Sequence, residues 1–390
     1  MHVWREGPPV PFSFTMSTPM LRIVHADTDD LENPLRGGQP VRTFSVNSRL
    51  AQRHDVTVLT STYKSARRRV ERKGVKYRRL GFRVPGFGLS PHLSFMASLG
   101  PVVARLPHDL AVEEFTPPVG FNGLPWWTTA PVILVVQWYF FEQWERRYRL
   151  PFSRWMKELA KKDRYHHVVV QSDAMRRELE PLLPRAHFRK IASGVEDSAF
   201  LPGPEKGEYV LFLGRIDIQH KGLDLLMEAW RKICGPKKIP LVIAGEGPAR
   251  HEMEAQVQRD NLQSQIRFVG RIEGTAKNEL LARSRLVVMP SRYETFGISA
   301  LEAMAAAKPV VCFDIPHLNE IAVPPWAEYA PRFDAVGLGH TVSKLWIQPD
   351  LCIRMGALAQ AHAQTFHWDQ IARQQEDFYL EIYESRHEKT

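Results

Sequence analysis

An α/β fold with two doubly wound parallel-sheet domains in series is predicted by three features of this 390-residue sequence. From residue 21 onward, short β-branched runs alternate with longer helical stretches, as in strands joined by helices that cover a parallel sheet. The alternation stops in residues 198–207, which hold two prolines and two glycines, and it restarts at residue 208. Beyond about residue 335 the pattern is helical throughout, and the total length suits two domains.

These patterns define the expected elements and domain limits. We expect a first domain in 21–197, a linker in 198–207, a second domain in 208–365, and a final helix in 366–390 whose apolar face returns to the first domain. Residues 1–20 are expected to be a loose arm or a start-site artefact. Expected helix 41–52 lies among first-domain strands at 21–26, 55–60, 75–80, 109–113, 132–137 and 168–171, and second-domain strands lie at 209–213, 241–244, 266–269, 286–289 and 310–313.

Composition narrows the class of protein. The cysteines Cys234, Cys312 and Cys352 are far apart and form neither a disulfide framework nor a zinc module, which predicts a reducing compartment and a cytoplasmic location. No apolar run reaches the length of a membrane span. The chain carries 52 basic and 43 acidic residues, so its excess of +9 favours an anionic partner without identifying it.

The segment 209–222 has the strongest chemical pattern. A predicted strand runs into Gly214, the next loop carries Arg215 and Lys221, and Gly222 opens a helix. Ligands of open α/β sheets bind at the carboxyl ends of strands, and two cations beside a helix N-terminus suit a diphosphate. The alternative is a solvated pair of loop cations.

A second pattern, in 289–304, contains two carboxylates that can contact different parts of one elongated ligand. Glu294 lies in a loop and Glu302 in the helix that begins near Gly297. A carboxylate accepts two hydrogen bonds at once, which suits a vicinal diol of a sugar. Weaker glycine signals are the turn that contains Gly245 and Gly247, and the pair Gly37 and Gly38 after the first strand.

Together these motifs resemble the retaining glycosyltransferases of family 4, over about residues 21–384. The resemblance rests on Gly-Arg-x5-Lys-Gly, Gly-x-Gly-Pro, Pro-Ser-x2-Glu-x-Phe-Gly-x4-Glu-Ala-Met and the two glycines after the first strand. It implies the GT-B fold, with two Rossmann-like domains facing each other across a cleft. It also implies transfer of a sugar, with retention and without a metal cofactor, from a nucleotide diphosphate-sugar to a hydroxyl acceptor.

The resemblance assigns roles residue by residue. Arg215 and Lys221 are expected to stabilise the departing diphosphate, Glu294 to hold sugar hydroxyls and Glu302 the ribose. Gln137 stands where the family commonly has a histidine, and its side chain cannot titrate. Because the family uses no such metal site, the Asp27-Thr-Asp-Asp30 segment is interpreted as a loop. The remaining expected donor-binding residues are Gly37, Gly38, Gly214, Gly245, Gly247, Arg271, Ile272, Phe296, Gly297 and Ile298.

Two features of the first domain bear on the acceptor. Residues 64–79 carry nine basic residues and one acid, Glu71, which suits docking on anionic lipid or a polyanionic acceptor, whereas the alternative is a solvated loop and edge strand. An aromatic group around Trp126 and Trp138 suits sugar or apolar acceptors, but such residues more often belong to a core. Glu113, Glu114 and Trp138 are the candidate acceptor contacts.

Two other classes of function fit the same sequence. On the same fold, a disaccharide synthase or a phosphorylase is the catalytic alternative. The non-catalytic alternative is a polyanion-binding protein that uses residues 64–79. The sequence contains no recognised nucleic-acid-binding module, so we do not expect nucleic acid to bind. The sequence does not determine the donor base, the sugar, the acceptor or the oligomeric state.

Overall fold

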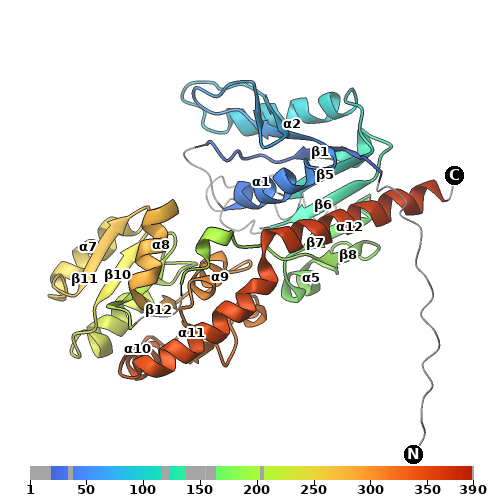
Figure 1. Ribbon diagram of the computed structural model, residues 1–390. Coiled ribbons are helices and arrows are strands. Elements are labelled where there is room, and N and C mark those ends of the chain that lie inside the picture. The colour runs from blue at the N-terminus through green and yellow to red at the C-terminus, as the bar shows by residue number, and fades with distance from the viewer. Residues whose placement is uncertain are drawn as a thin grey trace, which may run out of the picture.

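The structure, a computed structural model, contains two α/β domains, one built on an eight-stranded sheet and one on a six-stranded sheet (Figure 1). In the first sheet the strand order is β3-β4-β2-β1-β5-β6-β7-β8, and only β3 runs antiparallel to its neighbour. The residues that the structure describes are 19–33, 38–115, 123–137, 154, 164–202 and 206–388. The strands of the first sheet are β1 Arg22–Ala26, β2 Asp55–Ser61, β3 Arg69–Arg72, β4 Val75–Leu80, β5 Leu110–Phe115, β6 Val132–Val136, β7 His167–Val170 and β8 His187–Lys190.

The second sheet is parallel throughout, in the order β11-β10-β9-β12-β13-β14. Its strands are β9 Tyr209–Leu213, β10 Leu241–Ala244, β11 Ile266–Gly270, β12 Ser284–Met289, β13 Val310–Phe313 and β14 Ala327–Ala330.

Helices cover both faces of the sheets. The α-helices are α1 Gln39–Leu50, α2 Ser90–Val103, α5 Asp173–Leu179, α6 Leu223–Ala229, α7 Arg250–Arg259, α8 Gly274–Arg283, α9 Ile298–Ala305, α10 Ala335–Trp346, α11 Pro349–Ala363 and α12 Trp368–His387. Short helical turns are η1 Leu124–Trp126, η2 Asp197–Ala199, η3 Trp230–Cys234, η4 Leu318–Glu320 and η5 Gln364–Phe366. Within the described ranges, none of the helices combines the length and the apolar character that crossing a membrane requires.

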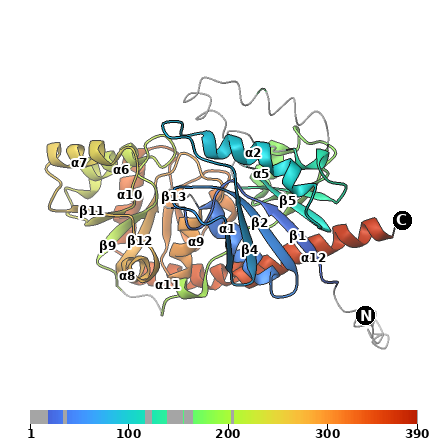
Figure 2. The same ribbon diagram turned by 90° about the horizontal axis from the view of Figure 1, so that it is seen from above.

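Burial explains why these segments form parallel strands. The five residues of β6, Val-Ile-Leu-Val-Val, are all buried, as expected for a strand with helices on both sides. In the first domain, α2 and α5 pack on one face of the sheet, whereas α1 and α12 pack on the other. Figure 2 shows α2 and α12 on opposite sides of the first sheet.

The final helix returns to the first domain, which confirms the prediction. Phe378, Tyr379 and Ile382 of α12 are buried in one cluster with Val46 and Leu50 of α1. These α12 positions recur at the three-and-four spacing of one helix face. The chain therefore crosses between the domains twice.

The two crossings lie side by side. The backbone N–H of Val195, on the outgoing crossing, donates to the carbonyl oxygen of Phe366, on the returning one, at 2.9 Å. Val195 also forms an isolated bridge with His367. The two crossings thus form one paired connection between the domains.

The predicted strands are all present, with ends shifted by one or two residues, but β8 and β14 were not predicted. Both are edge strands. β8 has the sequence His-Phe-Arg-Lys, and β14 has the sequence Ala-Glu-Tyr-Ala. Because an edge strand faces solvent along one side, it lacks the apolar run by which the central strands are recognised. β3 is also an edge strand, as the alternative for residues 64–79 anticipated.

Replacing Phe378 tests how far α12 stabilises the first domain. The Phe378 side chain is fully buried, and its ring contacts the ring of His167 edge to face. Phe378→Ala is expected to destabilise the first domain by about 3–5 kcal/mol because it leaves a cavity. Urea unfolding measures the loss. Leu358→Ala, at a half-exposed position of α11, is the control, and an equal loss in both variants would contradict the anchoring role of α12.

Candidate active site

A cavity of about 550 Å³ opens between the domains, at the carboxyl ends of β9, β10 and β11. Its wall brings together eight of the residues predicted from the sequence, which come from both domains: Gly38, Gly214, Arg215, Gly245, Arg271, Ile272, Ile298 and Glu302. The other lining residues are Val41, Leu213, Ala244, Glu246, Glu273, Lys277 and Ser299.

Two helix N-termini from opposite domains meet at this cavity. Gly38 precedes the first turn of α1, and Ile298 begins α9. The domains approach closely here, since a side chain at Gly38 would lie 3.7 Å from Cδ1 of Ile298. Helix N-termini present free N–H groups and the positive end of the helix dipole. The cavity therefore favours an anion between α1 and α9.

Basic side chains add to this positive field. The guanidinium of Arg215 lines the cavity, and its side chain is 54% exposed, with Asp217 3.8 Å away. Lys221 lies beside the cavity wall, because a side chain at Gly214 would touch its Cε. Its ammonium contacts Oε1 of Glu294 at 2.6 Å, and the Ser291 hydroxyl donates to the same oxygen at 2.7 Å. The predicted Lys221 and Glu294 thus form a mostly buried ion pair at the margin of the cavity.

The far end of the cavity also carries ion pairs. Lys277 of α8 contacts Glu302 of α9 at 2.6 Å, and Arg271 contacts Glu273 at 2.8 Å. Lys277 and Glu273 were not identified from the sequence. Their place in the sequence could have identified them, because both follow β11 within seven residues and so lie at the edge of the sheet where ligands bind.

The glycines of the Gly-x-Gly-Pro turn serve backbone packing. Gly245 has φ +149°, and a side chain there would lie 1.8 Å from the carbonyl oxygen of Gly214. A side chain at Gly247 would lie 2.2 Å from the carbonyl oxygen of Ile216. Only bare backbone allows the two loops to pack this closely.

Three predicted donor-binding residues lie outside the cavity wall. Phe296 is buried in the core and contacts the ring of Phe366. Gly297, at φ +91°, is the N-cap of α9, and Gly247 belongs to the packed turn. These three residues shape the site rather than line it. The predicted Gly37 and Trp138 lie outside the described residues.

In the first domain, a buried polar chain crosses the ends of three adjacent strands. His25 Nε2 lies 3.1 Å from Glu114 Oε1, and the Gln137 amide donates to Glu114 Oε2 at 2.9 Å. Asn47 contacts the other ring nitrogen of His25 at 2.8 Å. Glu114 thus fixes the orientation of the Gln137 side chain.

The two glutamates predicted to contact the acceptor are fully buried. Glu113 accepts hydrogen bonds from the Tyr165 hydroxyl at 2.9 Å and from the Leu124 N–H at 3.2 Å. Glu114 is occupied by His25 and Gln137. In this arrangement neither carboxylate reaches the surface, because each is held in the interior by its own hydrogen-bond partners.

Asp27 is a buried carboxylate next to this chain. It accepts hydrogen bonds from the Thr43 hydroxyl at 2.6 Å and from the Gln39 amide at 2.8 Å, both on α1. Burial, followed by repulsion from Glu114, raises the pKa of Asp27 to about 7. Asp27 therefore ties the end of β1 to the first turns of the helix whose N-terminus faces the cavity.

The basic stretch 64–79 is less free than its composition suggests. Arg79 is buried and pairs with Asp30 and Glu32, each at 2.9 Å, and Arg72 contacts the same two carboxylates. Lys76 pairs with Asp55 at 2.7 Å. Three of the nine cations are thus neutralised within the fold. The prediction that the whole stretch docks on a polyanion is therefore corrected: only its exposed cations are left for such a partner.

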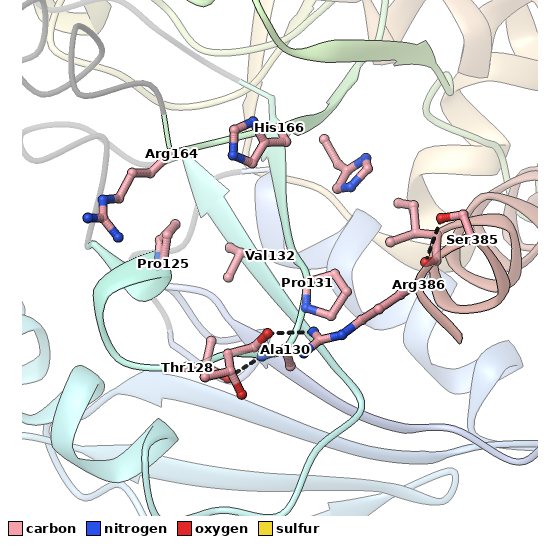
Figure 3. Close-up of a pocket in the computed structure, with 12 residues that line it drawn as sticks. Pro125, Thr128, Ala130, Pro131, Val132, Arg164, His166, Ser385 and Arg386 are labelled. Atoms are coloured by element: carbon pink, nitrogen blue, oxygen red, sulfur yellow. Dashed lines mark hydrogen bonds between the residues drawn. The ribbon is translucent and has the colours of Figure 1, made fainter. Parts of the chain in front are cut away.

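A further cavity, of about 430 Å³, lies away from this site (Figure 3). It is lined by Val132 and His167, the first residues of β6 and β7, and by the end of α12. Arg386 of α12 reaches across it and donates to the carbonyl oxygen of Thr129. Because it lies at the amino ends of the strands, it is not part of the candidate site.

Two family models match the chain. The model described as Glycosyltransferase Family 4 matches residues 36–199, and the model described as Glycosyl transferases group 1 matches residues 196–325. An uncharacterized glycosyltransferase of Methanocaldococcus jannaschii is 35% identical over 165 residues, which are 42% of this chain and 36% of that protein. The matches to the first curated relatives span less than half of those relatives' length.

Solved structures share the fold over nearly the whole chain. The sucrose-phosphate synthase of Thermosynechococcus elongatus has a TM-score of 0.78 at 21% identity, covering 94% of this chain and 100% of that chain. Anabaena Alr3699/HepE, in complex with UDP and glucose, has a TM-score of 0.73 at 17% identity, covering 92% and 99%. The GT-B architecture expected from the sequence is confirmed.

The raised pKa of Asp27 predicts a pH-dependent gain from Asp27→Asn. The pKa of Asp27 is near 7 in the folded protein and near 4 in the unfolded chain. The protonated carboxyl of wild type therefore stabilises the fold fully below about pH 4, and this contribution is lost as the pH rises from there through 7. The variant is expected to gain on the order of 2–4 kcal/mol in unfolding free energy over wild type between about pH 4 and pH 7.5. Urea unfolding across this range measures the difference, and a pH-independent difference would contradict it.

Proposed function

The chain belongs to glycosyltransferase family 4, and from that membership we propose that it transfers a sugar from a nucleotide diphosphate-sugar to a hydroxyl acceptor. We further propose that the transfer retains the anomeric configuration and needs no metal. The acceptor class stays broad, and includes cell-envelope glycans, glycolipids and natural products.

One observation carries the donor proposal: the N-termini of α1 and α9 and the Arg215 guanidinium meet at one cavity. A diphosphate gains negative charge as the glycosidic bond breaks. Positive groups placed beforehand stabilise that charge more in the transition state than in the ground state. In the proposed complex, Lys221 adds a second cation from its position beside Gly214.

The rest of the donor follows the length of the cavity. In the proposed complex, Glu302, which pairs with Lys277, accepts hydrogen bonds from the ribose diol. The backbone at Arg271 and Ile272, two residues that line the cavity, contacts the base. Glu294, which pairs with Lys221 at the margin of the cavity, accepts hydrogen bonds from the hydroxyls of the transferred sugar. Because Alr3699/HepE was solved with UDP and glucose, UDP-glucose is the first donor to test.

Retention follows from a reaction on one face of the sugar. The bond from the acceptor oxygen to the anomeric carbon forms on the face from which the phosphate oxygen leaves, and that phosphate oxygen takes the acceptor proton. Gln137 cannot take the proton, but Glu114 orients its amide, which supports a positioning role for Gln137. The cations and helix ends supply the positive charge that a metal would otherwise provide.

The buried, well-separated cysteines support a cytoplasmic location, since none is paired in the described chain. A peripheral position at the cytoplasmic face of a membrane is the finer part of this proposal. The exposed cations left in residues 64–79 support it.

Thermal unfolding in the presence of nucleotides tests the donor site. Wild type is expected to be stabilised by one of UDP, GDP, ADP or dTDP, by about 2.7 kcal/mol at a hundredfold excess over the dissociation constant. Lys221→Ala and Glu302→Ala each remove a charged contact, and each is expected to weaken binding by about 10- to 100-fold.

Lys232→Ala is the matched control, because Lys232 forms an exposed ion pair with Glu228 on the surface of the second domain. It should keep the full nucleotide stabilisation. If no nucleotide stabilises wild type, or if the control loses as much as the site variants, the proposed donor site is rejected.

The stereochemistry and the metal requirement are tested on the product. With an α-linked nucleotide sugar, proton NMR of the fresh product is expected to show an α linkage. Excess EDTA is expected to change the rate less than about twofold, since catalysis is assigned to protein charges. A β-linked product would overturn retention, and loss of activity that Mg²⁺ or Mn²⁺ restores would overturn metal independence.

A further inference from the structure

A third cavity, of about 350 Å³, opens at the carboxyl ends of β1, β2 and β4. The loops after these three strands and the first turn of α2 form its wall: Asn33, Ser61, Thr62, Tyr63, Lys64, Ser65, Arg83, Gly88, Pro91 and His92. Asn33 belongs to the same connection between β1 and α1 as Gly38, which lines the cavity between the domains that is proposed to bind the donor and is called the donor cavity below. This headgroup cavity, as we call it, therefore lies on the edge of the sheet that faces the donor cavity.

The wall of the headgroup cavity is cationic. Lys64 and Arg83 are exposed, and no acidic side chain pairs with either in the described part of the chain. Glu32, which contacts Tyr63, is compensated by Arg72 and Arg79. Asp29 is an acidic group that acts on His92, and its carboxylate accepts a hydrogen bond from Asn33 at 3.0 Å.

Further cations extend this surface. Arg67, Arg68 and Arg69 follow Lys64 on the same segment and are exposed. They are distinct from Arg72 and Arg79, which the fold neutralises internally. Together with Lys64, they leave positive charge for an external partner on the segment that enters the headgroup cavity.

An apolar cluster borders the same cavity. Phe82, Val84, Phe87 and Leu93 are 44–61% exposed, and they are four of the ten large apolar side chains exposed in the described chain. All four fall in the loop after β4 and the first turn of α2. Single exposed apolar residues are common, whereas such a concentration beside cations marks an interaction surface.

Hydrogen bonds hold this cluster in its exposed position. The N–H of Phe82 donates to the Ser94 hydroxyl at 2.9 Å, and the N–H of Val84 donates to the Ser90 hydroxyl at 2.8 Å. Ser90 and Ser94 lie in α2, which packs on the first sheet through Phe95 and Leu99. The loop that bears the apolar side chains is thus fixed to α2, which Figure 1 shows on the side of the first domain away from the second domain.

We propose that this surface docks on an anionic membrane, with a lipid phosphate between Lys64 and Arg83 and with Phe82, Val84, Phe87 and Leu93 inserted among the lipids. Basic side chains attract anionic headgroups, and apolar side chains on a fixed loop enter the interface beneath them. This inference rests on the proposed function, since it places a lipid-borne acceptor at the edge of the sheet that faces the donor.

Cosedimentation with vesicles tests the docking. Wild type is expected to bind vesicles of about three parts phosphatidylcholine to one part phosphatidylglycerol at least tenfold more tightly than pure phosphatidylcholine. The apolar variant, Phe82→Ser with Phe87→Ser, and the cation variant, Lys64→Gln with Arg83→Gln, are each expected to lose about tenfold or more on the anionic vesicles.

Leu358→Ser with Arg354→Gln is the matched control, since it removes an exposed apolar and an exposed basic side chain from α11. Wild-type binding by the apolar variant, or an equal loss in the control, would overturn the proposal. Inorganic phosphate is the second probe. If it stabilises wild type and not the cation variant while vesicles fail to bind, the headgroup cavity takes soluble phosphate and the lipid assignment is overturned.

Nucleotide stabilisation of the same variants separates this inference from the proposed function. None of the substituted residues lines the donor cavity, so all variants should keep the wild-type response to the nucleotide. Loss of that response in the apolar variant would mean that the loop had misfolded. In that event Phe82→Leu, which keeps the apolar surface, tests the docking, and it should keep vesicle binding. Absence of any nucleotide response in wild type would reject the proposed donor site, whereas vesicle binding would still decide the docking surface.

Discussion

The packing of α12 on α1 is the contact on which the geometry of the site depends. The N-terminus of α1 forms one side of the donor cavity, while the opposite side, at Ile298, belongs to the other domain. Because α12 reaches α1 through the crossing paired at Val195 and Phe366, the position of α1 is set by a segment that enters from the second domain. The two helix ends thus meet although the chain that joins them is long.

The charges of the candidate site are paired before any ligand arrives. Lys221 holds Glu294, Lys277 holds Glu302 and Arg271 holds Glu273. A cation and a carboxylate that neutralise each other avoid the cost of partial burial. On the proposed function, a bound donor exchanges some of these internal contacts for contacts to its phosphate and hydroxyl groups.

Much of this arrangement could be predicted from the sequence, because both local patterns and motif spacing carry it. The alternation of strands and helices predicted both sheets, and eight predicted residues meet at the donor cavity. The edge strand β8 was not predicted because it has no continuous apolar run. Three features could not be predicted from the sequence, because each depends on residues from another part of the chain: the burial of Glu113, the partners of Asp27 and the internal pairing of Arg79.

The charged composition of the sheet edges has a consequence for the behaviour of the protein at high concentration. The two borders of the first sheet are β3, with the sequence Arg-Val-Glu-Arg, and β8, with the sequence His-Phe-Arg-Lys, and along its outer side neither pairs with another strand of the described ranges. Such borders can add strands from a second molecule and start aggregation, and basic side chains oppose this by mutual repulsion. The charged residues that weaken the strand signal of these two segments are thus also the residues expected to oppose such association.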